Sequence, residues 1–416
     1  MKKGLLALGA LFAICLSMLA TDMVVKQKNG EDWKINVDDV EEVFFEENAI
    51  IPEDSTVVDV SETFLLFNIL SDSTVEVTRD DSGDDRSYLG HDSITIPERV
   101  RIGGKVYTVT SIGAGAFIYN YNLKSIDIPD GVTNIGASAF DGCDSLNPKL
   151  LVYDKGTKCY GWVGDKKKCT EVVIPDGVTS IGEWAFSDCI SLTSINIPEG
   201  MTNIGAFVFY GCSNLININI PEGVTSIGEW AFSDCISLTS INIPESVTSI
   251  EVKTFFGCSS LTSIEIPDGV TSIETSAFWD CSSLKSINVA TNNPMYSSEN
   301  GVIYNKNKTV IIFIPKGIAP QLLIYDNGTK CYGWVGDKDK CTDVVIPESV
   351  TNIETKAFFD CSSLTNIKIP ESVTNIGSSA FYKCSSLDVI VDNSKDNVEV
   401  GGAAFTGCKS VTWLKD

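Results

Sequence analysis

Residues 177–199 read GVTSIGEWAFSDCISLTSINIPE, and the same 23 residues recur without a change at 223–245. Looser copies surround both stretches. A cysteine marks each copy at intervals of 23 residues within a block, at Cys189, Cys212, Cys235, Cys258 and Cys281 and again at Cys361 and Cys384. A fixed period of this length is the sequence signature of a solenoid, in which each repeat packs on its neighbours.

The residues of one repeat explain the stacking. Ile195 and Ile197 alternate with polar residues, which predicts a strand with one apolar side, and the proline that follows helps to end it. Residues 178–182 form a second short extended piece. Ala185, Phe186 and Cys189 then supply small, large and small apolar groups at helix-like spacing. One copy cannot bury these groups alone, so we expect stacked copies to form a continuous core.

The pattern L-x-x-I-x-I-P-x-x-V-T-x-I-x-x-x-A-F-x-x-C-x-x-L resembles the BspA-like leucine-rich repeat, and the resemblance covers about residues 109–416. It implies a β-rich (α/β) leucine-rich-repeat solenoid, a curved right-handed stack of repeats of about 23 residues. It also implies a secreted or cell-surface location and a role in adhesion to host proteins or other cells. The resemblance implies no particular ligand.

The start of the chain predicts export. Lys2 and Lys3 precede an apolar run that ends at Ala20, as in a secretory signal peptide, so we assign residues 1–20 to the signal. Its removal takes the formal charge of -24 to about -26. Such a charge disfavours nucleic acid and anionic lipid as partners. No later segment is long and apolar enough to span a membrane. We expect a secreted or surface-located monomer without a cofactor.

Two β-rich segments precede the repeats. In residues 21–48, Asn29-Gly30 between the alternating runs 23–25 and 33–37 predicts a hairpin, and a further strand is expected at 43–45. Residues 49–108 also read as strands and are the natural cap over the first repeat. Within the cap, four carboxylates surround Gly83, but their spacing is not that of a calcium loop. Charge runs are usually solvated, and we predict no metal site.

Two kinds of insert, within 147–175 and 290–347, interrupt the repeats of residues 109–416. The 26 residues 150–175 return at 322–347 with four changes. Residues 289–315 predict a hairpin that turns over 305–308. Both kinds of insert look like strand pairs that do not stop the stack.

The fourteen cysteines fall into three groups. One lies in the signal, nine form the repeat column, and four belong to the duplicated inserts. Column neighbours one strand spacing apart are too far for a disulfide, so we expect reduced packing groups. For the insert pairs Cys159–Cys169 and Cys331–Cys341 two interpretations stay open. The first pair flanks a turn centred near Gly164, which favours a disulfide, but Cys169 falls where other repeats have a buried Leu.

The sequence gives little support to catalysis. The only histidine is His91, beside Asp92, so triads and most acid–base pairs lack a second partner. Glycines fall at turns of the repeat and form no phosphate-binding loop. We predict that the protein is not an enzyme.

Two columns are candidate binding residues. Asn196, Asn219 and Asn242, here called the amide column, occupy exposed strand positions of the concave sheet, the usual binding surface of a solenoid. They either contact a polar partner or only keep the sheet soluble. Trp184, Phe207 and Trp230, here called the aromatic column, precede the Ala-Phe pair or its equivalent in three successive repeats. They form either a contact strip for sugars or proteins or a local shield over the turn.

Three functions are compatible with these features. The first is adhesion by binding host or bacterial proteins through the solenoid. The second is glycan binding through exposed aromatic side chains. The third is a structural spacer without a dedicated ligand.

Overall fold

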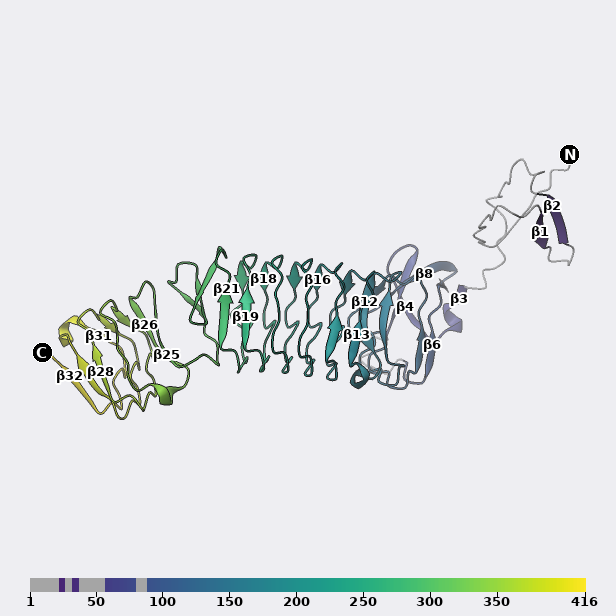
Figure 1. The fold of residues 1–416 in the computed structure, drawn as a ribbon. Helices are drawn as coiled ribbons and strands as arrows, with labels where there is room; N and C mark the ends of the chain where they lie inside the picture. Colours follow the sequence, from purple (N-terminus) through teal and green to yellow (C-terminus); the bar gives the residue numbers. More distant parts are fainter. Residues whose placement is uncertain (1–21, 27–31, 37–56, 80–87) are drawn as a thin grey trace.

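The computed structural model describes residues 22–26, 32–36, 57–79 and 88–416. From residue 57 onward these form an elongated β-solenoid of about 13 stacked turns (Figure 1), which confirms the predicted solenoid. The expected signal peptide, the expected strand at 43–45 and most of the acidic loop around Gly83 lie outside the described residues. In the described part the helical segments are short 3-10 turns: η2 (Val60–Glu62), η3 (Lys166–Lys168), η4 (Lys338–Lys340) and η5 (Lys395–Asn397).

One set of strands comes from the Ile-x-Ile part of the repeat. Members pair in parallel with the equivalent strand of the next rung, which lies 23 residues on in Val172↔Ile195 and Ile264↔Ile287. All except the terminal β32 have an exposed–buried–exposed pattern or a close variant, because alternate side chains point to opposite faces. The set comprises β6 (Ser93–Thr95), β9 (Ser125–Asp127), β13 (Glu171–Val173), β15 (Ser194–Asn196), β19 (Ser263–Ile266), β21 (Ser286–Val289), β28 (Asn366–Ile369), β30 (Asp388–Val391) and β32 (Ser410–Trp413).

A second set comes from the Thr-Ser-Ile part of the repeat and is shorter. Its members also pair in parallel from rung to rung, as in Ile204↔Ile227. The set comprises β10 (Asn134–Ile135), β14 (Ser180–Ile181), β16 (Asn203–Ile204), β17 (Ser226–Ile227), β18 (Ser249–Ile250), β20 (Ser272–Ile273), β27 (Asn352–Ile353), β29 (Asn375–Ile376) and β31 (Glu399–Val400). The two sets supply the two strand faces of the stack.

The segment with helix-like spacing is a series of turns. Trp184 and Asp188 have φ angles of 62° and 56°, in the left-handed region. A helix cannot continue through such residues, because its residues need negative φ. The amide of Cys189 instead bonds the carbonyl of Phe186 at 3.1 Å, and the amide of Phe186 bonds the carbonyl of Val208 in the next rung at 2.9 Å. The expected helical element is therefore absent from these rungs.

The core is a ladder of identical side chains along the stack. In the central rungs Phe186, Phe209, Phe232, Phe255 and Phe278 are buried and stack nearly parallel, with ring centroids 5.3 to 5.7 Å apart. Offset stacks of this spacing are favourable beyond the area that they bury. The column cysteines and the Leu column are buried beside them, so the sequence pattern correctly predicts the core.

The N-terminal cap is a mixed sheet in the order β3-β7-β8-β5-β4. Its strands are β3 (Val57–Asp59), β4 (Leu66–Ile69), β5 (Thr74–Thr78), β7 (Arg99–Ile102) and β8 (Lys105–Ile112). The end of β8 pairs in parallel with β10, so the cap sheet runs directly into the repeats. Since β6 pairs in parallel with β9, stacking already begins at residue 93. Separately, β1 (Asp22–Lys26) and β2 (Asp32–Asn36) form the predicted antiparallel hairpin.

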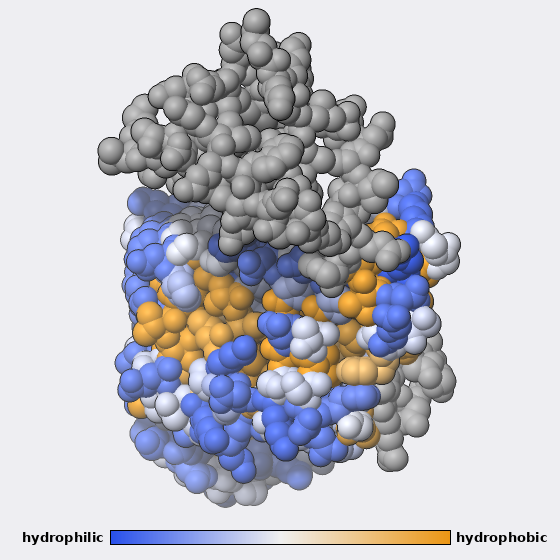
Figure 2. All heavy atoms as spheres, turned by 90° about the vertical axis from the view of Figure 1, so that its right-hand side faces the viewer, coloured by the Kyte–Doolittle hydropathy of each residue, from blue (hydrophilic) through white to orange (hydrophobic). Residues whose placement is uncertain are grey.

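Hydrophobic residues gather in a band across the end face on the side of the cap, between hydrophilic residues above and below it (Figure 2). Four apolar side chains in or beside β4 are exposed: Phe64, Leu66, Ile69 and Leu70.

The inserts are hairpins that join the stack. β11 (Lys149–Tyr153) pairs antiparallel with β12 (Lys158–Val163), and β12 pairs in parallel with β14 of the next rung. β25 (Gln321–Tyr325) and β26 (Lys330–Val335) repeat this arrangement, with β26 parallel to β27. The other insert is a three-stranded antiparallel sheet of β22 (Tyr296–Glu299), β23 (Val302–Asn305) and β24 (Ile311–Phe313). The predicted hairpin over 305–308 is present. The first insert continues the stack as predicted, but in the described chain no parallel pairing of strands crosses from β21 to β25, so the expectation of an unbroken stack is wrong for the region 290–347.

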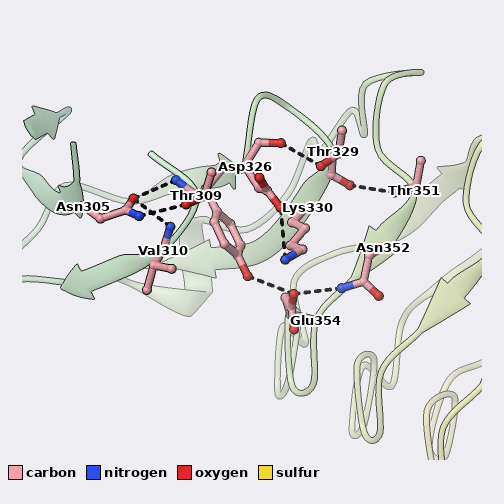
Figure 3. A network of polar contacts seen from close by, with 10 residues as sticks. Asn305, Thr309, Val310, Asp326, Thr329, Lys330, Thr351, Asn352 and Glu354 are labelled. Atoms are coloured by element: carbon pink, nitrogen blue, oxygen red, sulfur yellow. Dashed lines mark hydrogen bonds and ion pairs between the residues drawn. The ribbon is translucent and has the colours of Figure 1, made fainter. Parts of the chain in front are cut away.

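The axis of the stack changes direction between β21 and β25 (Figure 1). A small separate core of Val302, Tyr304, Ile318, Leu323 and Val335 lies at this junction. A polar network continues across it to the following rungs (Figure 3). In this network the hydroxyl of Tyr325 donates to the carboxylate of Glu354 at 2.9 Å, and the amide of Asn352 donates to the same oxygen at 2.8 Å. These bonds link the insert to the C-terminal rungs.

Candidate binding surfaces

The amide column lies on the exposed side of the Ile-x-Ile segments. Asn196 is the last residue of β15, and Asn219 and Asn242 occupy the same position one and two rungs further on. All three side chains are exposed, and within the described residues none of them makes a hydrogen bond or ion pair. Each amide therefore offers an acceptor and two donor hydrogens to solvent or to a partner, one strand spacing of ~4.8 Å apart.

In each duplicated insert, a valine occupies the position that asparagine holds in the amide column. Val173 pairs with Asn196 in the parallel register, and its exposed fraction is 73%. Val345 occupies the corresponding place in the second insert and is 82% exposed. Neither valine is part of the core, and neither was predicted from the sequence as a candidate binding residue. Both are the second Val of the Val-Val-Ile-Pro sequence that ends each insert, and this place in the sequence is the signal that identifies them.

The aromatic column lies in the turn after the second strand set, and its rings stack on one another. Trp184 and Phe207 have ring centroids 3.9 Å apart and are almost parallel, at 5°; Phe207 and Trp230 are 5.8 Å apart at 14°. All three side chains are half-buried. Their φ angles of 62°, 56° and 57° show that the whole column has left-handed backbone. The sequence pattern gave no signal of this conformation.

Neighbouring side chains cover much of the ring surface that the mutual stacking of the aromatic column leaves exposed. The ring of Tyr210 contacts all three members at tilted angles, with centroids 6.1 to 6.3 Å away. Lys253, at the equivalent position of the rung after Trp230, places its Nζ 4.1 Å from the ring centroid of Trp230, a cation–π contact. Both faces of Phe207 and one face of Trp230 are thus occupied within the protein. The column presents mainly ring edges.

The two columns are not brought together into one site. They come from different segments of each rung, and no hydrogen bond or ring contact joins them within the described part of the chain. A partner that contacts the amide column along the Ile-x-Ile segments would not meet the aromatic column on the same face.

The cysteine pairs Cys159–Cys169 and Cys331–Cys341 are not disulfides in the structure, where all four thiols are free and buried. The expected turn at Gly164 is wrong. The hairpin turns at residues 154–157, so Cys159 pairs with Val152 across it and Cys169 lies beyond β12. Cys159 aligns with Ile181 on one strand face, whereas Cys169 precedes β13 on the other.

The residues considered for chemistry are engaged elsewhere. The ring of His91 stacks on Phe64 at 3.5 Å between centroids, and Asp92 forms an ion pair with Lys124 at 3.2 Å. Among the described residues no three His, Cys, Asp or Glu side chains are grouped to hold a metal ion. In the same part of the chain no helix is long and apolar enough to cross a membrane.

A cavity of about 230 Å³ opens between the hairpin of β23 and β24 and the turn after β25. Its charged lining is already paired. Lys308 binds Glu299 at 2.8 Å, and Nζ of Lys306 donates to the carbonyls of Thr291 and Asn293. The lining leaves few polar groups for a ligand, and this cavity is a weak candidate.

Comparison with known proteins places the chain in a family. The model of the BspA type leucine rich repeat region matches residues 93–155, 156–285, 202–319 and 336–415. The chain belongs to this family. The matches include the first duplicated insert, the last part of the second, and the amide and aromatic columns, and they begin at the rung of β6, where parallel stacking starts.

Solved structures of similar proteins come from several bacteria. A leucine rich cell surface protein from Faecalibacterium prausnitzii A2-165 is 28% identical, with 85% of this chain and 93% of that chain covered and a TM-score of 0.41. A leucine-rich repeat protein from Bacteroides ovatus ATCC 8483 is 23% identical, with 84% and 98% covered and a TM-score of 0.42. A T. pallidum leucine rich repeat protein is 26% identical, with 53% and 88% covered and a TM-score of 0.32. No curated protein matches the sequence significantly.

Proposed function

We propose that this protein is a secreted or cell-surface adhesion protein that binds an extended polar segment of a partner protein along its Ile-x-Ile strand face. The observation that carries the proposal is the amide column, whose three exposed side chains make no hydrogen bond within the described structure. Amides in register can bond successive polar groups of an extended chain. Membership of a family of repeat proteins and the likeness to a leucine rich cell surface protein support this assignment.

The exposed valine beside the column adds an apolar contact. Val173 stands next to Asn196 in the same exposed row. An apolar side chain within a polar row is a common composition for a protein interface, in which a few desolvated side chains supply most of the binding energy. The formal charge of -24 would in addition accelerate association with basic partners at low salt.

Glycan binding is a weaker proposal. Sugars stack on the faces of aromatic rings, as cations and other rings do. In the aromatic column the face-to-face contacts of Trp184, Phe207 and Trp230 already use most of these faces. The stack therefore favours a role in shielding and stiffening the turns.

The test combines pull-down of host matrix proteins with a glycan array, using the protein without its signal. The variant carries Asn196→Ala, Asn219→Ala and Asn242→Ala. We expect affinity for a captured protein to fall roughly tenfold or more, because several hydrogen bonds worth ~1 kcal/mol each are lost. We expect the melting temperature to stay nearly the same, since the three side chains are exposed and make no hydrogen bond or ion pair within the described structure.

A matched control carries Glu199→Gln, Glu222→Gln and Glu245→Gln. These residues are exposed in the turns of the same rungs, and their replacement should leave affinity within about twofold at physiological salt, because exposed charges are largely screened. Equal affinity of the amide variant and the wild type would reject the strand face as the binding site. Binding to the glycan array alone would reject a protein partner.

A further inference from the structure

In each duplicated insert, one cysteine contacts a column cysteine of the following rung. The thiols of Cys169 and Cys189 lie close enough to interact, and so do those of Cys341 and Cys361. All four side chains are inaccessible to solvent. The contact occurs twice, in two parts of the chain that belong to different core clusters.

The parallel register explains this contact. Val172 pairs with Ile195, so Cys169 falls at the position that Leu192 holds in the next rung. A cysteine at a buried Leu position points into the core, where the cysteine column also lies. The Leu position of the insert is thus the feature that brings two thiols together.

The two partner cysteines also differ from the rest of their column. Seven column thiols donate to the carbonyl of a core Phe of the preceding rung at 3.0 to 3.2 Å; these are Cys143, Cys212, Cys235, Cys258, Cys281, Cys384 and Cys408. Cys189 and Cys361 make no such bond, because the rung before each of them is a hairpin insert. Their thiols face the insert cysteine instead.

A lysine of the short 3-10 turn lies beside each pair. Lys166 and Lys338 open η3 and η4, and each turn ends at the insert cysteine. In the second pair the hydrogen bond from Cys341 lowers the pKa of the Cys361 thiol, and the charge of Lys338 acts in the same direction. The thiolate is the nucleophile in disulfide exchange, so Cys361 is the more reactive member of its pair.

We propose that Cys169–Cys189 and Cys341–Cys361 are two disulfide sites that close when the exported chain meets a disulfide reagent. One thiol loses its proton, attacks a sulfur of the reagent and expels one reagent thiolate. The second cysteine, also as thiolate, then attacks the mixed disulfide, forms the intramolecular bond and expels the second reagent thiolate. Each pair loses two electrons and two protons, and the reagent gains both as two thiols. Each bond would tie an insert to the rung that follows.

The experiment refolds the full mature chain in oxidised glutathione, blocks the remaining thiols, and digests after lysine and glutamate. This digestion separates Cys159, Cys169 and Cys189 into three fragments, since Lys158, Lys168, Glu171 and Glu183 lie between or before them. We expect linked fragments for Cys169 with Cys189 and for Cys341 with Cys361, each lighter by two hydrogens than the reduced fragments.

The matched variants are Cys169→Leu and Cys341→Leu, which install the residue that other repeats carry at this position. Each should lose its own linked fragment, keep the other, and remain folded. The wild type should melt several degrees higher when oxidised than when reduced, and the double variant should melt at one temperature in both states. Links of Cys159 with Cys169, or thiols that all stay free after complete oxidation, would overturn the proposal. A double variant as sensitive to reductant as the wild type would also overturn it.

Discussion

The two duplicated inserts have nearly the same sequence and hairpin but different surroundings. Tyr160 of the first insert is 8% exposed and packs edge-on against Phe140, with ring centroids 5.5 Å apart. The corresponding residue of the second insert, Tyr332, is 41% exposed. The first insert follows a regular rung, whose core includes Phe140. The second follows the three-stranded insert of β22 to β24.

This difference separates what a repeat specifies from what its neighbour specifies. The hairpin, the 3-10 turn and the contact of the insert cysteine are the same in both inserts, so the local sequence determines them. The burial of the tyrosine differs between the two inserts, because a solenoid rung completes its core only with the side chains of the adjacent rung. Equivalent substitutions in the two inserts test this distinction.

Replacement of the two tyrosines by alanine should give the largest contrast. Tyr160→Ala removes a buried ring and should cost about 3–5 kcal/mol in unfolding free energy, whereas Tyr332→Ala should cost less than about 1 kcal/mol. Urea unfolding followed by circular dichroism measures both. Similar losses of unfolding free energy in the two variants would show that the neighbouring rung does not determine the environment of the tyrosine.

Two glycines at equivalent positions of the two inserts should instead behave alike. Gly161 and Gly333 have φ angles of 126° and 110°, and a Cβ on either would collide with the backbone of Ala185 or Ala357. Gly161→Ala and Gly333→Ala should each cost about 3 kcal/mol, because the strain and the collision cannot be relieved by a side-chain movement. Thermal unfolding of the two variants side by side measures this. A loss in only one insert would contradict local control of the hairpin.

A smaller contrast concerns one hydroxyl. The backbone amide of Phe140 donates to the hydroxyl of Tyr160 at 3.1 Å. Tyr160→Phe leaves this buried amide without its acceptor and should cost about 1–2 kcal/mol, while Tyr332→Phe should have almost no effect. Amide hydrogen exchange at Phe140 should accelerate in the first variant. Unchanged exchange there would mean that water replaces the hydroxyl.

The smallest effect is expected from the lysines of the 3-10 turns. Lys166 is 3.6 Å from the carboxylate of Asp141 and donates to the carbonyl of Ser187, whereas Lys338 donates to a carbonyl of its own insert. Lys166→Met should therefore destabilise the protein by up to about 1 kcal/mol more than Lys338→Met at low salt. The difference should shrink in 1 M salt. A difference that salt leaves unchanged would point to packing.

The sequence was sufficient for the features that follow from alternation along a strand and from the stacking of one rung on the next. The Phe ladder, the buried cysteine column and the exposed amide column follow from alternation and stacking alone. The position of Cys169 at a Leu site also followed from counting residues back from Pro175. These features depend on the register of one rung on the next, which the period encodes directly.

Other features depend on local backbone conformation, which the pattern of apolar residues does not encode. Spacing alone favoured a helix around Phe186, but left-handed residues at Trp184 and Asp188 make turns instead. In the first insert both Gly156 and Gly164 have positive φ, and the hairpin uses the first of them, so the turn that favoured a disulfide between Cys159 and Cys169 was placed at the wrong glycine. The sequence pattern likewise does not predict that the rings of the aromatic column stack on one another.

The identical stretches that begin at Gly177 and Gly223 give the gene a route to changes in length. Recombination between them would remove or add 46 residues, the offset between the two glycines. The product would contain only rung-to-rung junctions that already exist in the parent protein. The side chains at every junction would therefore pack as they do in the parent. Two rungs correspond to about 10 Å of solenoid. The reach of the protein, and the number of amides on its strand face, could therefore change in steps between generations without any new fold having to be selected.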